Sequence, residues 1–329
     1  MNSVALQPRD PLAAPPRPAG APPCEGACAA LAAEIRRRLS EAAVVRAREP
    51  MARRTTLGVG GPADVHVEPA SEEDLAELRR FCHERALPFR VVGRGSNLLV
   101  RDGGIRGVVV SLAHPVFTRV SVEGNQVRAG AGARLKQVAV EARRASLAGL
   151  EFLEGIPGSV GGALRMNAGA HAAWTFDVLD AVRFMTPAGE TRERPASEVP
   201  AGYRSCPFFA DHLALAAVFR GQPAEASVIH AQMEELSERR RASQPRQPSA
   251  GCIFKNPDAI PAGRLIDQLG LKGSRVGGAE VSPVHANFMV NTGGATARDF
   301  LELIAQVRAR VRAAAGVELE TEVEIVGED

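Results

Sequence analysis

Residues 149–170 (GLEFLEGIPGSVGGALRMNAGA) constrain the fold of this chain more than any other segment. They hold six glycines in 22 residues, where average composition would give about one or two. Glycine lacks a Cβ atom and tolerates positive φ, so consecutive backbone N–H groups can converge on one anion. The alternative is a flexible surface loop, but large apolar residues recur throughout the segment and a solvated linker would not need them. We therefore expect a packed loop that cradles a phosphate.

Composition excludes several classes of protein. The 329 residues suggest about two domains. Lys and Arg (40) nearly balance Asp and Glu (38), which argues against a general nucleic-acid or anionic-membrane surface. No apolar run approaches the roughly 18 residues of a membrane helix, and the N-terminus does not resemble a secretory signal. Five cysteines form no disulfide scaffold in a chain of this length. We predict a cytoplasmic protein without nucleic-acid or membrane partners.

The N-terminal segment differs in composition from the rest of the chain. Residues 1–29 carry seven of the 23 prolines and few large apolar side chains, so we predict a disordered tail. Cys24 and Cys28 have no matching histidine or second cysteine pair there, so we expect no metal site. A helix is predicted over residues 31–48.

From residue 51 onward, short strands, glycine turns and helices follow in an α+β order rather than in regular βαβ alternation. Helices are predicted after Ser71, around 135–142, over 225–241 and after Thr296; Ser71 and Thr296 suit N-caps. Strands are predicted at 63–67, 89–92, 108–112, 119–122, 126–129, 181–186, 190–194, 213–220 and 318–326. A domain boundary is expected near 220–225.

Two further glycine-rich turns lie in the N-terminal half. Residues 91–98 (VVGRGSNL) run from a strand into a turn, but a Rossmann fingerprint would need glycine where Leu98 stands. Residues 55–62 (TTLGVGGP) form the other turn. One large anionic ligand explains all three glycine-rich segments more economically than three unrelated turns.

The second half holds the residue types that suit acid–base chemistry. Arg204 in YRSCP is a planar cation suited to carboxylates, although a surface arginine is the simpler interpretation. A buried cysteine is usually inert, but the polar neighbours of Cys252 in AGCIFKNP make a functional thiol an equal alternative. His285 stands alone, and a lone histidine is more often a structural hydrogen bonder than a catalyst. The alternating residues Glu318, Glu320, Glu322 and Glu324 should share one face of a strand, where at least one is a candidate site carboxylate.

Eight motifs in order resemble the UDP-N-acetylenolpyruvoylglucosamine reductase family over about residues 50–327. They are TTLGVGGPA, VVGRGSNLLV, LEFLEGIPGSVGGALRMNAGA, GYRSCPF, AGCIFKNP, LIDQLGLKG, VHANFMVNTGGAT and VELETEV. The chain is most similar to the short class, which lacks an extra substrate-capping insertion.

The resemblance implies an α+β fold: a vanillyl-alcohol-oxidase-like (PCMH-type) FAD-binding domain of two lobes at residues 30–222, and an α+β substrate domain at 223–329. It implies FAD and NADPH as cofactors and a UDP-N-acetylglucosamine enolpyruvate as substrate, reduced to UDP-N-acetylmuramate for peptidoglycan. Hydride would pass from flavin N5 to C3 and a proton to C2. We expect a monomer without a metal.

The resemblance also implies site residues. Arg204 and Glu322 would stabilise the enolate and Cys252 would protonate C2. The substrate site would be lined by Tyr203, Lys255, Asn256, His285 and Asn287. FAD would be bound by Thr55, Thr56, Gly93, Gly95, Ser96, Asn97, Leu98, Ile156, Pro157, Gly158, Ser159, Gly161, Gly162, Asn167 and Gly169.

The chain departs from the family pattern at three positions. Cys252 stands where the family has the serine proton donor, Cys206 where YRxS ends in serine, and Thr321 where a proline usually precedes the glutamate. A thiol is a stronger acid than an alcohol, so the substitution at 252 is chemically mild. Two other functions stay open: a flavin oxidase of the same fold, and a non-catalytic nucleotide-sugar binding protein.

Overall fold

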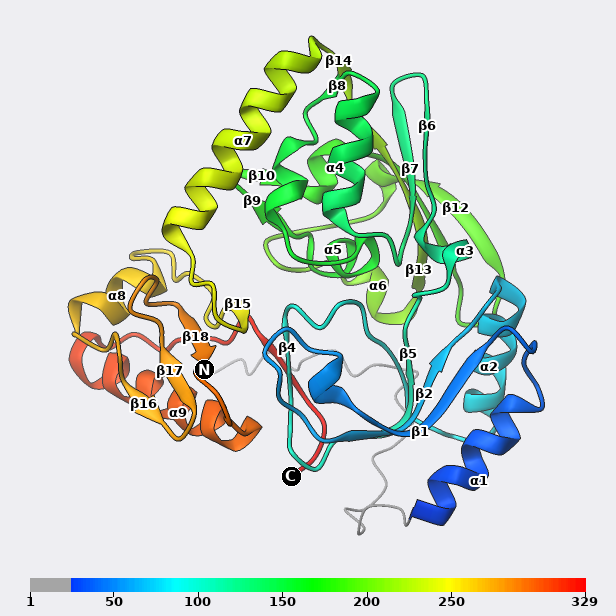
Figure 1. The fold of residues 1–329 in the computed structure, drawn as a ribbon, viewed down its shortest axis with the longest axis horizontal. Helices are drawn as coiled ribbons and strands as arrows, with labels where there is room; N and C mark the ends of the chain where they lie inside the picture. The colour runs from blue at the N-terminus through cyan, green and yellow to red at the C-terminus, as the bar shows by residue number, and fades with distance from the viewer. Residues whose placement is uncertain (1–24) are drawn as a thin grey trace, which may run out of the picture.

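The structure is a computed structural model that describes residues 25–329. It has three bodies, each with its own sheet and hydrophobic core (Figure 1). We call them the first lobe, the second lobe and the C-terminal body, in the order in which the chain builds their sheets. The second lobe lies at the top of Figure 1, the first lobe at the lower right and the C-terminal body at the left.

The first lobe is a four-stranded sheet of order β1-β2-β5-β3. Strand β5 (Ile105–Val110) runs parallel to β2 (Pro62–Glu68) and β3 (Phe89–Val91). Helix α2 (Glu72–Glu84) packs Leu75 and Phe81 against this sheet. The predicted N-cap is confirmed, because Ser71 Oγ accepts a hydrogen bond from Asp74 N at 3.1 Å.

The predicted helix over 31–48 is wrong in its second half. Helix α1 ends early (Glu25–Arg36), and β1 (Val44–Pro50) pairs antiparallel with β2 along its whole length. The β-branched pair Val44 and Val45 suits a strand, and pairing with a neighbour distant in sequence decides the outcome. Residues 25–29 lie in α1 rather than in a disordered tail, and Cys28 is buried there. Cys24 and the rest of the predicted tail lie outside the described residues.

The second lobe is a five-stranded sheet of order β12-β11-β13-β7-β6. Its predicted hairpins are confirmed: β6 (Val120–Glu123) with β7 (Gln126–Gly130), and β11 (Leu179–Met185) with β12 (Thr191–Pro195). Strand β13 (Leu213–Arg220) lies between the two pairs. The helices of this lobe are α3 (Pro115–Thr118), α4 (Leu135–Arg144), α5 (Val160–Met166), α6 (Phe208–Asp211) and α7 (Ala226–Ser243).

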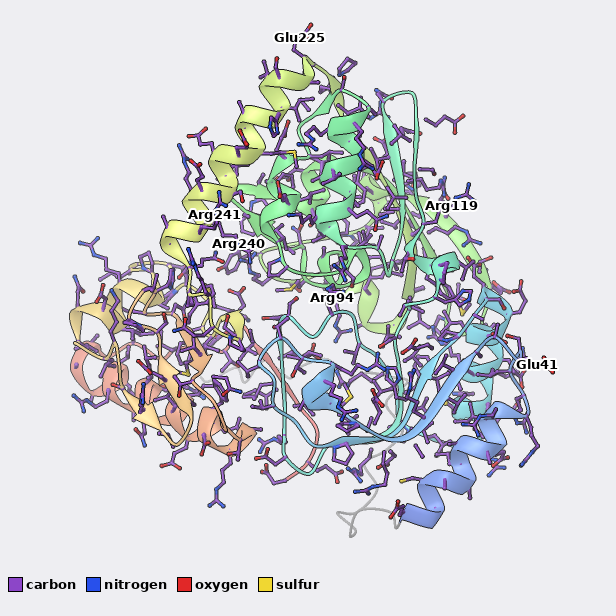
Figure 2. All side chains as sticks on the ribbon, in the orientation of Figure 1. Glu41, Arg94, Arg119, Glu225, Arg240 and Arg241 are labelled. Carbon is purple, nitrogen blue, oxygen red and sulfur yellow. The ribbon has the colours of Figure 1, made fainter. Side chains whose placement is uncertain are left out.

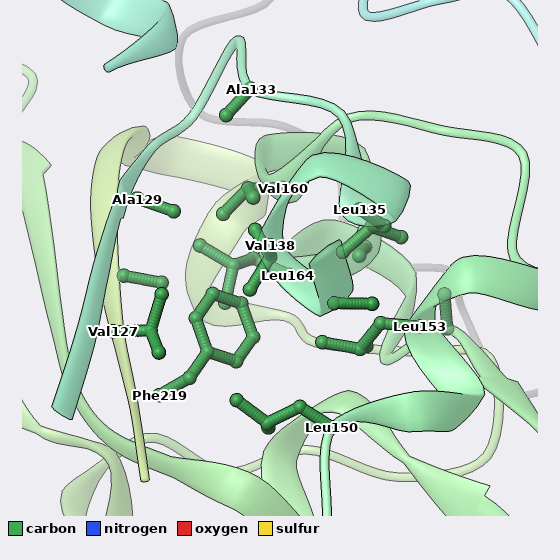
Figure 3. Packing of buried hydrophobic residues seen from close by; sticks show 14 of the residues in the cluster. Val127, Ala129, Ala133, Leu135, Val138, Leu150, Leu153, Val160, Leu164 and Phe219 are labelled. Atoms are coloured by element: carbon green, nitrogen blue, oxygen red, sulfur yellow. The ribbon is translucent and has the colours of Figure 1, made fainter. Parts of the chain in front are cut away.

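The glycine-rich segment 149–170 is packed, as predicted. Leu150, Leu153, Val160 and Leu164 lie in the core of the second lobe beside Phe219 of β13 (Figure 3). The segment forms a 3₁₀ turn η2 (Glu151–Gly155), then α5, then β9 (Gly169–Ala170), which pairs with β10 (Ala173–Trp174). The remaining short elements are β8 (Leu147–Ala148), β14 (Gln222–Pro223), and the 3₁₀ turns η1 (Met51–Arg53), η3 (Thr175–Val178) and η4 (Ala196–Glu198).

The C-terminal body packs helices on a four-stranded sheet of order β15-β18-β17-β16. The strands are β15 (Ser249–Cys252), β16 (Arg275–Val276), β17 (Ala279–Val281) and β18 (Phe288–Asn291), with helices α8 (Ala262–Gln268) and α9 (Ala297–Ala315). The capping box of α9 is confirmed, since Thr296 and Asp299 exchange their side-chain and backbone bonds. The predicted stripe on α9 is buried as well: Phe300, Leu303, Ile304, Val307 and Val311.

The predicted last strand over 318–326 is too long. Only β19 (Glu324–Val326) is a strand, and it runs parallel to β4 (Leu98–Val100), which sequence analysis had assigned to a turn. The four alternating glutamates therefore do not share one face: Glu318 pairs with Arg308, Glu320 with Lys255 and Glu322 with Arg204. Within residues 25–329, no helix is long and apolar enough to span a membrane.

Candidate active site

The three glycine-rich segments meet at one place between the lobes. Thr56 N donates to Gly95 O at 3.2 Å, which joins the first segment to the second. A Cβ atom at Gly93 would lie 2.5 Å from Ser159 Oγ, and one at Gly158 would lie 3.6 Å from Ser96 Oγ. The second segment therefore contacts the third directly, as the hypothesis of one shared ligand requires.

Two cations that sequence analysis did not select lie beside these segments. Arg94 belongs to the second segment and lies between the two lobes in Figure 2. Burial and the nearby charge of Arg134 lower the pKa of Arg94. Among the described residues, no carboxylate forms an ion pair with Arg94 or with Arg134. Two like charges without a carboxylate partner suit an anionic ligand such as a diphosphate.

Several predicted cofactor residues also have structural roles within the protein. Asn167 adopts φ 42° at the end of α5, donates from Nδ2 to Gly202 O at 3.2 Å, and accepts from Phe176 N at 3.1 Å. Leu98 is buried in β4. Ser159 caps α5 through Gly162 N at 3.3 Å. Sequence motifs alone could not separate these internal roles from ligand contacts.

Arg204 and Glu322 form the central pair of the site. Arg204 Nε donates to Glu322 Oε1 at 2.6 Å, with side chains only 18% and 10% exposed. Burial raises the pKa of Glu322, and the positive charges of Arg204 and Lys255 oppose that shift. Arg204 Nη1 is buried and has no hydrogen-bond partner among residues 25–329. A buried guanidinium nitrogen without a partner is costly, so this atom points to a missing acceptor.

Glu322 is fixed through its backbone. Its N–H donates to Ile253 O at 2.8 Å, and its carbonyl accepts from Asn97 Nδ2 at 3.1 Å. Asn97 belongs to the second glycine segment, so the predicted cofactor loop directly supports the predicted catalytic carboxylate.

Cys252 lies at the end of β15, within electrostatic reach of both members of this pair. Burial raises the pKa of the Cys252 thiol to about 12; Glu322 adds to the shift and Arg204 opposes it. The thiol therefore stays protonated at neutral pH. Cys206, the second departure from the family pattern, is buried in the core of the second lobe.

The residues predicted to line the substrate site differ in their exposure and in their partners. Tyr203 is 47% exposed, and its ring lies 5.2 Å from the Arg204 guanidinium. Lys255 Nζ pairs with Glu320 Oε2 at 3.1 Å. Asn256 Oδ1 accepts from Ala262 N at 3.1 Å, at the start of α8. Tyr203 and Lys255 thus keep groups at the surface, where a ligand could reach them.

His285 and Asn287 form hydrogen bonds within the C-terminal body. His285 Nδ1 accepts from Asn287 N at 3.2 Å, and burial lowers the pKa of its imidazole. Asn287 is buried and bonds Phe254 N and O through its side-chain amide, at 2.9 and 2.8 Å. Asn287 therefore orders the segment that carries Cys252 and Lys255.

A basic pocket beside the third glycine segment was missed by sequence analysis. It has a volume of about 260 Å³ and lies between Gly155 and the end of α7. Arg240 Nη1 donates to Gly155 O at 2.7 Å, and Arg241 lies next to it on α7 (Figure 2). Lys136 and Arg246 also line the pocket. The run of arginines at the end of α7 was the available signal. Among the described residues, no group of histidine, cysteine and carboxylate side chains could hold a metal ion.

Comparison with known proteins agrees with this geometry. The model of an "FAD binding domain" family matches residues 63–194, and that of "UDP-N-acetylenolpyruvoylglucosamine reductase, C-terminal domain" matches residues 244–326. These matches confirm the predicted fold class of an FAD-binding α+β domain followed by a C-terminal domain.

Relatives cover nearly the whole chain. It is 48% identical to UDP-N-acetylenolpyruvoylglucosamine reductase of Pelobacter propionicus over 85% of this chain and 95% of that protein. The identity to the Listeria innocua enzyme of the same name is 45% over 87% and 96%. The crystal structure of UDP-N-acetylenolpyruvylglucosamine reductase from Thermus caldophilus is similar at a TM-score of 0.75 and 39% identity, covering 86% of this chain and 99% of that one. The chain belongs to the UDP-N-acetylenolpyruvoylglucosamine reductase family.

Proposed function

We propose that this protein uses FAD and NADPH to reduce UDP-N-acetyl-3-O-(1-carboxyvinyl)-glucosamine to UDP-N-acetylmuramate, a precursor of peptidoglycan. Family membership supports the reaction. The observation that carries the proposal is the buried Arg204–Glu322 pair, which lies beside a protonated thiol and leaves one guanidinium nitrogen without a partner.

The three glycine segments fit FAD. They meet at one place, and the charges of Arg94 and Arg134 beside them suit its diphosphate. When bound, FAD supplies C3 of the enolpyruvyl group with a hydride obtained from NADPH. The basic pocket at Arg240 and Arg241 offers charge for the phosphates of a nucleotide.

Arg204 would bind the substrate carboxylate and stabilise the negative charge that develops as C2 and the carboxylate become an enolate. Arg204 Nη1, which has no partner in the described part of the chain, is suited to this contact. Glu322 holds the guanidinium through Nε, and burial raises the pKa of this carboxyl, so it carries a proton more readily than an exposed glutamate.

Cys252 would donate the proton to C2. The S–H bond breaks, the C2–H bond forms, and the thiolate recovers a proton from solvent after product release. A general acid must be protonated before the reaction, and a pKa of about 12 ensures this at neutral pH.

Absorbance spectroscopy tests the proposal. The purified protein should be yellow, should bleach under anaerobic NADPH, and should recolour when the UDP-enolpyruvyl sugar is added. Absence of recolouring would overturn the proposed reaction. Release of the flavin into the supernatant on denaturation would speak against a covalent flavin oxidase.

Two structural expectations accompany this function. Ile229 and Met233 of α7 lie in the core of the second lobe, so we propose that the substrate domain begins near residue 244 rather than at 223. The predicted monomer and the predicted cytoplasmic location stay predictions.

A further inference from the structure

The only tryptophan and the only tyrosine of this chain both lie against Arg204. The guanidinium carbon of Arg204 is 5.3 Å from the centre of the Trp174 ring and 5.2 Å from that of Tyr203. The two rings meet edge to face, with centroids 5.6 Å apart and an interplanar angle of 85°. Both distances are within the range of cation–π attraction.

Arg204 occupies an unfavourable backbone conformation. Its φ is 52°, in the left-handed region that non-glycine residues rarely adopt. The surrounding turn is closed by Gly202 N to Ser205 O at 2.8 Å, and Asn167 Nδ2 binds Gly202 O. A strained residue persists only when its surroundings hold it, and the rings and Glu322 do so here.

Neighbouring residues fix the position of the Trp174 ring. Trp174 N donates to Asp177 Oδ2 at 2.8 Å at the start of η3. A Cβ atom at Gly169 would lie 2.4 Å from Trp174 Cε3, so only glycine leaves room for the indole at this place. Gly169 was predicted as a cofactor residue, and this contact provides a second reason for a glycine there.

We propose that Trp174 is a positioning residue of this enzyme: its indole, with the Tyr203 ring, holds the Arg204 guanidinium so that Nε binds Glu322 and Nη1 faces the substrate carboxylate. The proposal rests on the proposed function. The rings also exclude water from the guanidinium, which strengthens its attraction to a carboxylate. Trp174 itself does not touch the reacting atoms in this account.

Stopped-flow absorbance of the holoenzyme separates this role from a general structural one. Trp174→Leu keeps an apolar side chain but loses the aromatic face. Reoxidation of the reduced flavin by saturating UDP-enolpyruvyl sugar should slow about tenfold, whereas flavin reduction by NADPH should change less than twofold. Trp174→Phe, which retains an aromatic face, should recover the reoxidation rate to within about threefold of wild type.

The proposal is overturned if Trp174→Leu reoxidises within twofold of wild type, or if both half-reactions slow equally. Failure of the wild-type protein to recolour would overturn the proposed function instead, so the two failures are distinguishable.

A second measurement needs no substitution and serves if Trp174→Leu does not fold. Because the chain has one tryptophan, emission excited at about 295 nm reports Trp174 alone. Titration of the oxidised holoenzyme with the UDP-enolpyruvyl sugar should change that emission saturably. UDP-N-acetylglucosamine, which lacks the carboxylate, should produce less than half of the change. Unchanged emission, while the flavin spectrum reports binding, would overturn the proposal.

Discussion

The C-terminal body meets the two lobes in different ways. Its contact with the first lobe combines backbone bonds with an ion pair: β19 pairs with β4, Asp102 accepts from Ala297 N and Arg298 N at 2.9 Å each at the start of α9, and Arg90 pairs with Glu324 at 2.8 Å. Thr56 Oγ1 also donates to Ser249 O at 2.6 Å. The contacts with the second lobe that reach the site are side-chain ion pairs, Arg204–Glu322 at 2.6 Å and Arg165–Glu324 at 3.5 Å.

The two interfaces therefore have different roles: the one with the first lobe stabilises the fold, and the one with the second lobe forms the proposed catalytic pair. Glu322 is held by the backbone of the C-terminal body and by Asn97 of the first lobe, whereas Arg204 comes from a strained turn of the second lobe. The proposed catalytic pair therefore spans an interface. Substitutions on the first-lobe side should change the free energy of unfolding, and those on the second-lobe side should change the rate.

The largest effect is expected at Cys252, which lies on the C-terminal side of the pair. Cys252→Ala removes the proposed proton donor and should slow reoxidation of the flavin by substrate about 10²- to 10⁴-fold, with NADPH reduction nearly unchanged. Cys252→Ser restores an O–H donor and should keep most of the activity. Stopped-flow measurement of both half-reactions decides; a normal reoxidation rate in Cys252→Ala would remove Cys252 from the mechanism.

Arg204→Lys tests whether the second-lobe side of the pair controls the reaction rate. A lysine cannot bind Glu322 and a substrate carboxylate through one planar group, so reoxidation should slow about a hundredfold. The matched control is Arg165→Lys, a more exposed pair of the same interface, for which we expect less than a twofold change. Equal losses in both variants would show that the interface, rather than Arg204, governs the rate.

Asp102→Ala addresses the first-lobe side. Its carboxylate accepts from two N–H groups at the N-terminus of α9, so its loss should lower the free energy of unfolding by about 1 kcal/mol. Urea denaturation measures this, and kcat should stay within twofold of wild type. Asp102→Asn keeps one acceptor and should lose less. A large fall in kcat would contradict the separation of stability from chemistry.

The smallest effect is expected in the pH profile. With the pKa of Cys252 raised to about 12, the thiol loses no proton between pH 7 and 10, whereas an ordinary thiol would ionise above about 8.5. Reoxidation rates of wild type and Cys252→Ser should therefore run parallel over this range, since serine does not ionise there. A wild-type rate that falls above pH 8.5 while that of Cys252→Ser does not would show an unshifted thiol.

Local patterns predicted much of the fold. The Ser71 and Thr296 caps, the two hairpins of the second lobe and the stripe on α9 depend on nearby residues, and all are confirmed. Strands β1 and β4 and all four strands of the C-terminal sheet (β15, β16, β17 and β18) were missed, because these short segments form strands only by pairing with other parts of the chain.

The candidate site, like the fold, was predicted from the sequence only in part. The amino-acid sequence by itself determined the glycine segments, the Arg204, Cys252 and Glu322 motifs and, through them, the family. Only the tertiary structure showed that Arg204 and Glu322, which the family motifs had named, bond each other directly, that Asn287 bonds Phe254, and that Trp174 faces the guanidinium. Burial, charge pairing and ring contacts arise between residues far apart in the chain, so no local pattern encodes them.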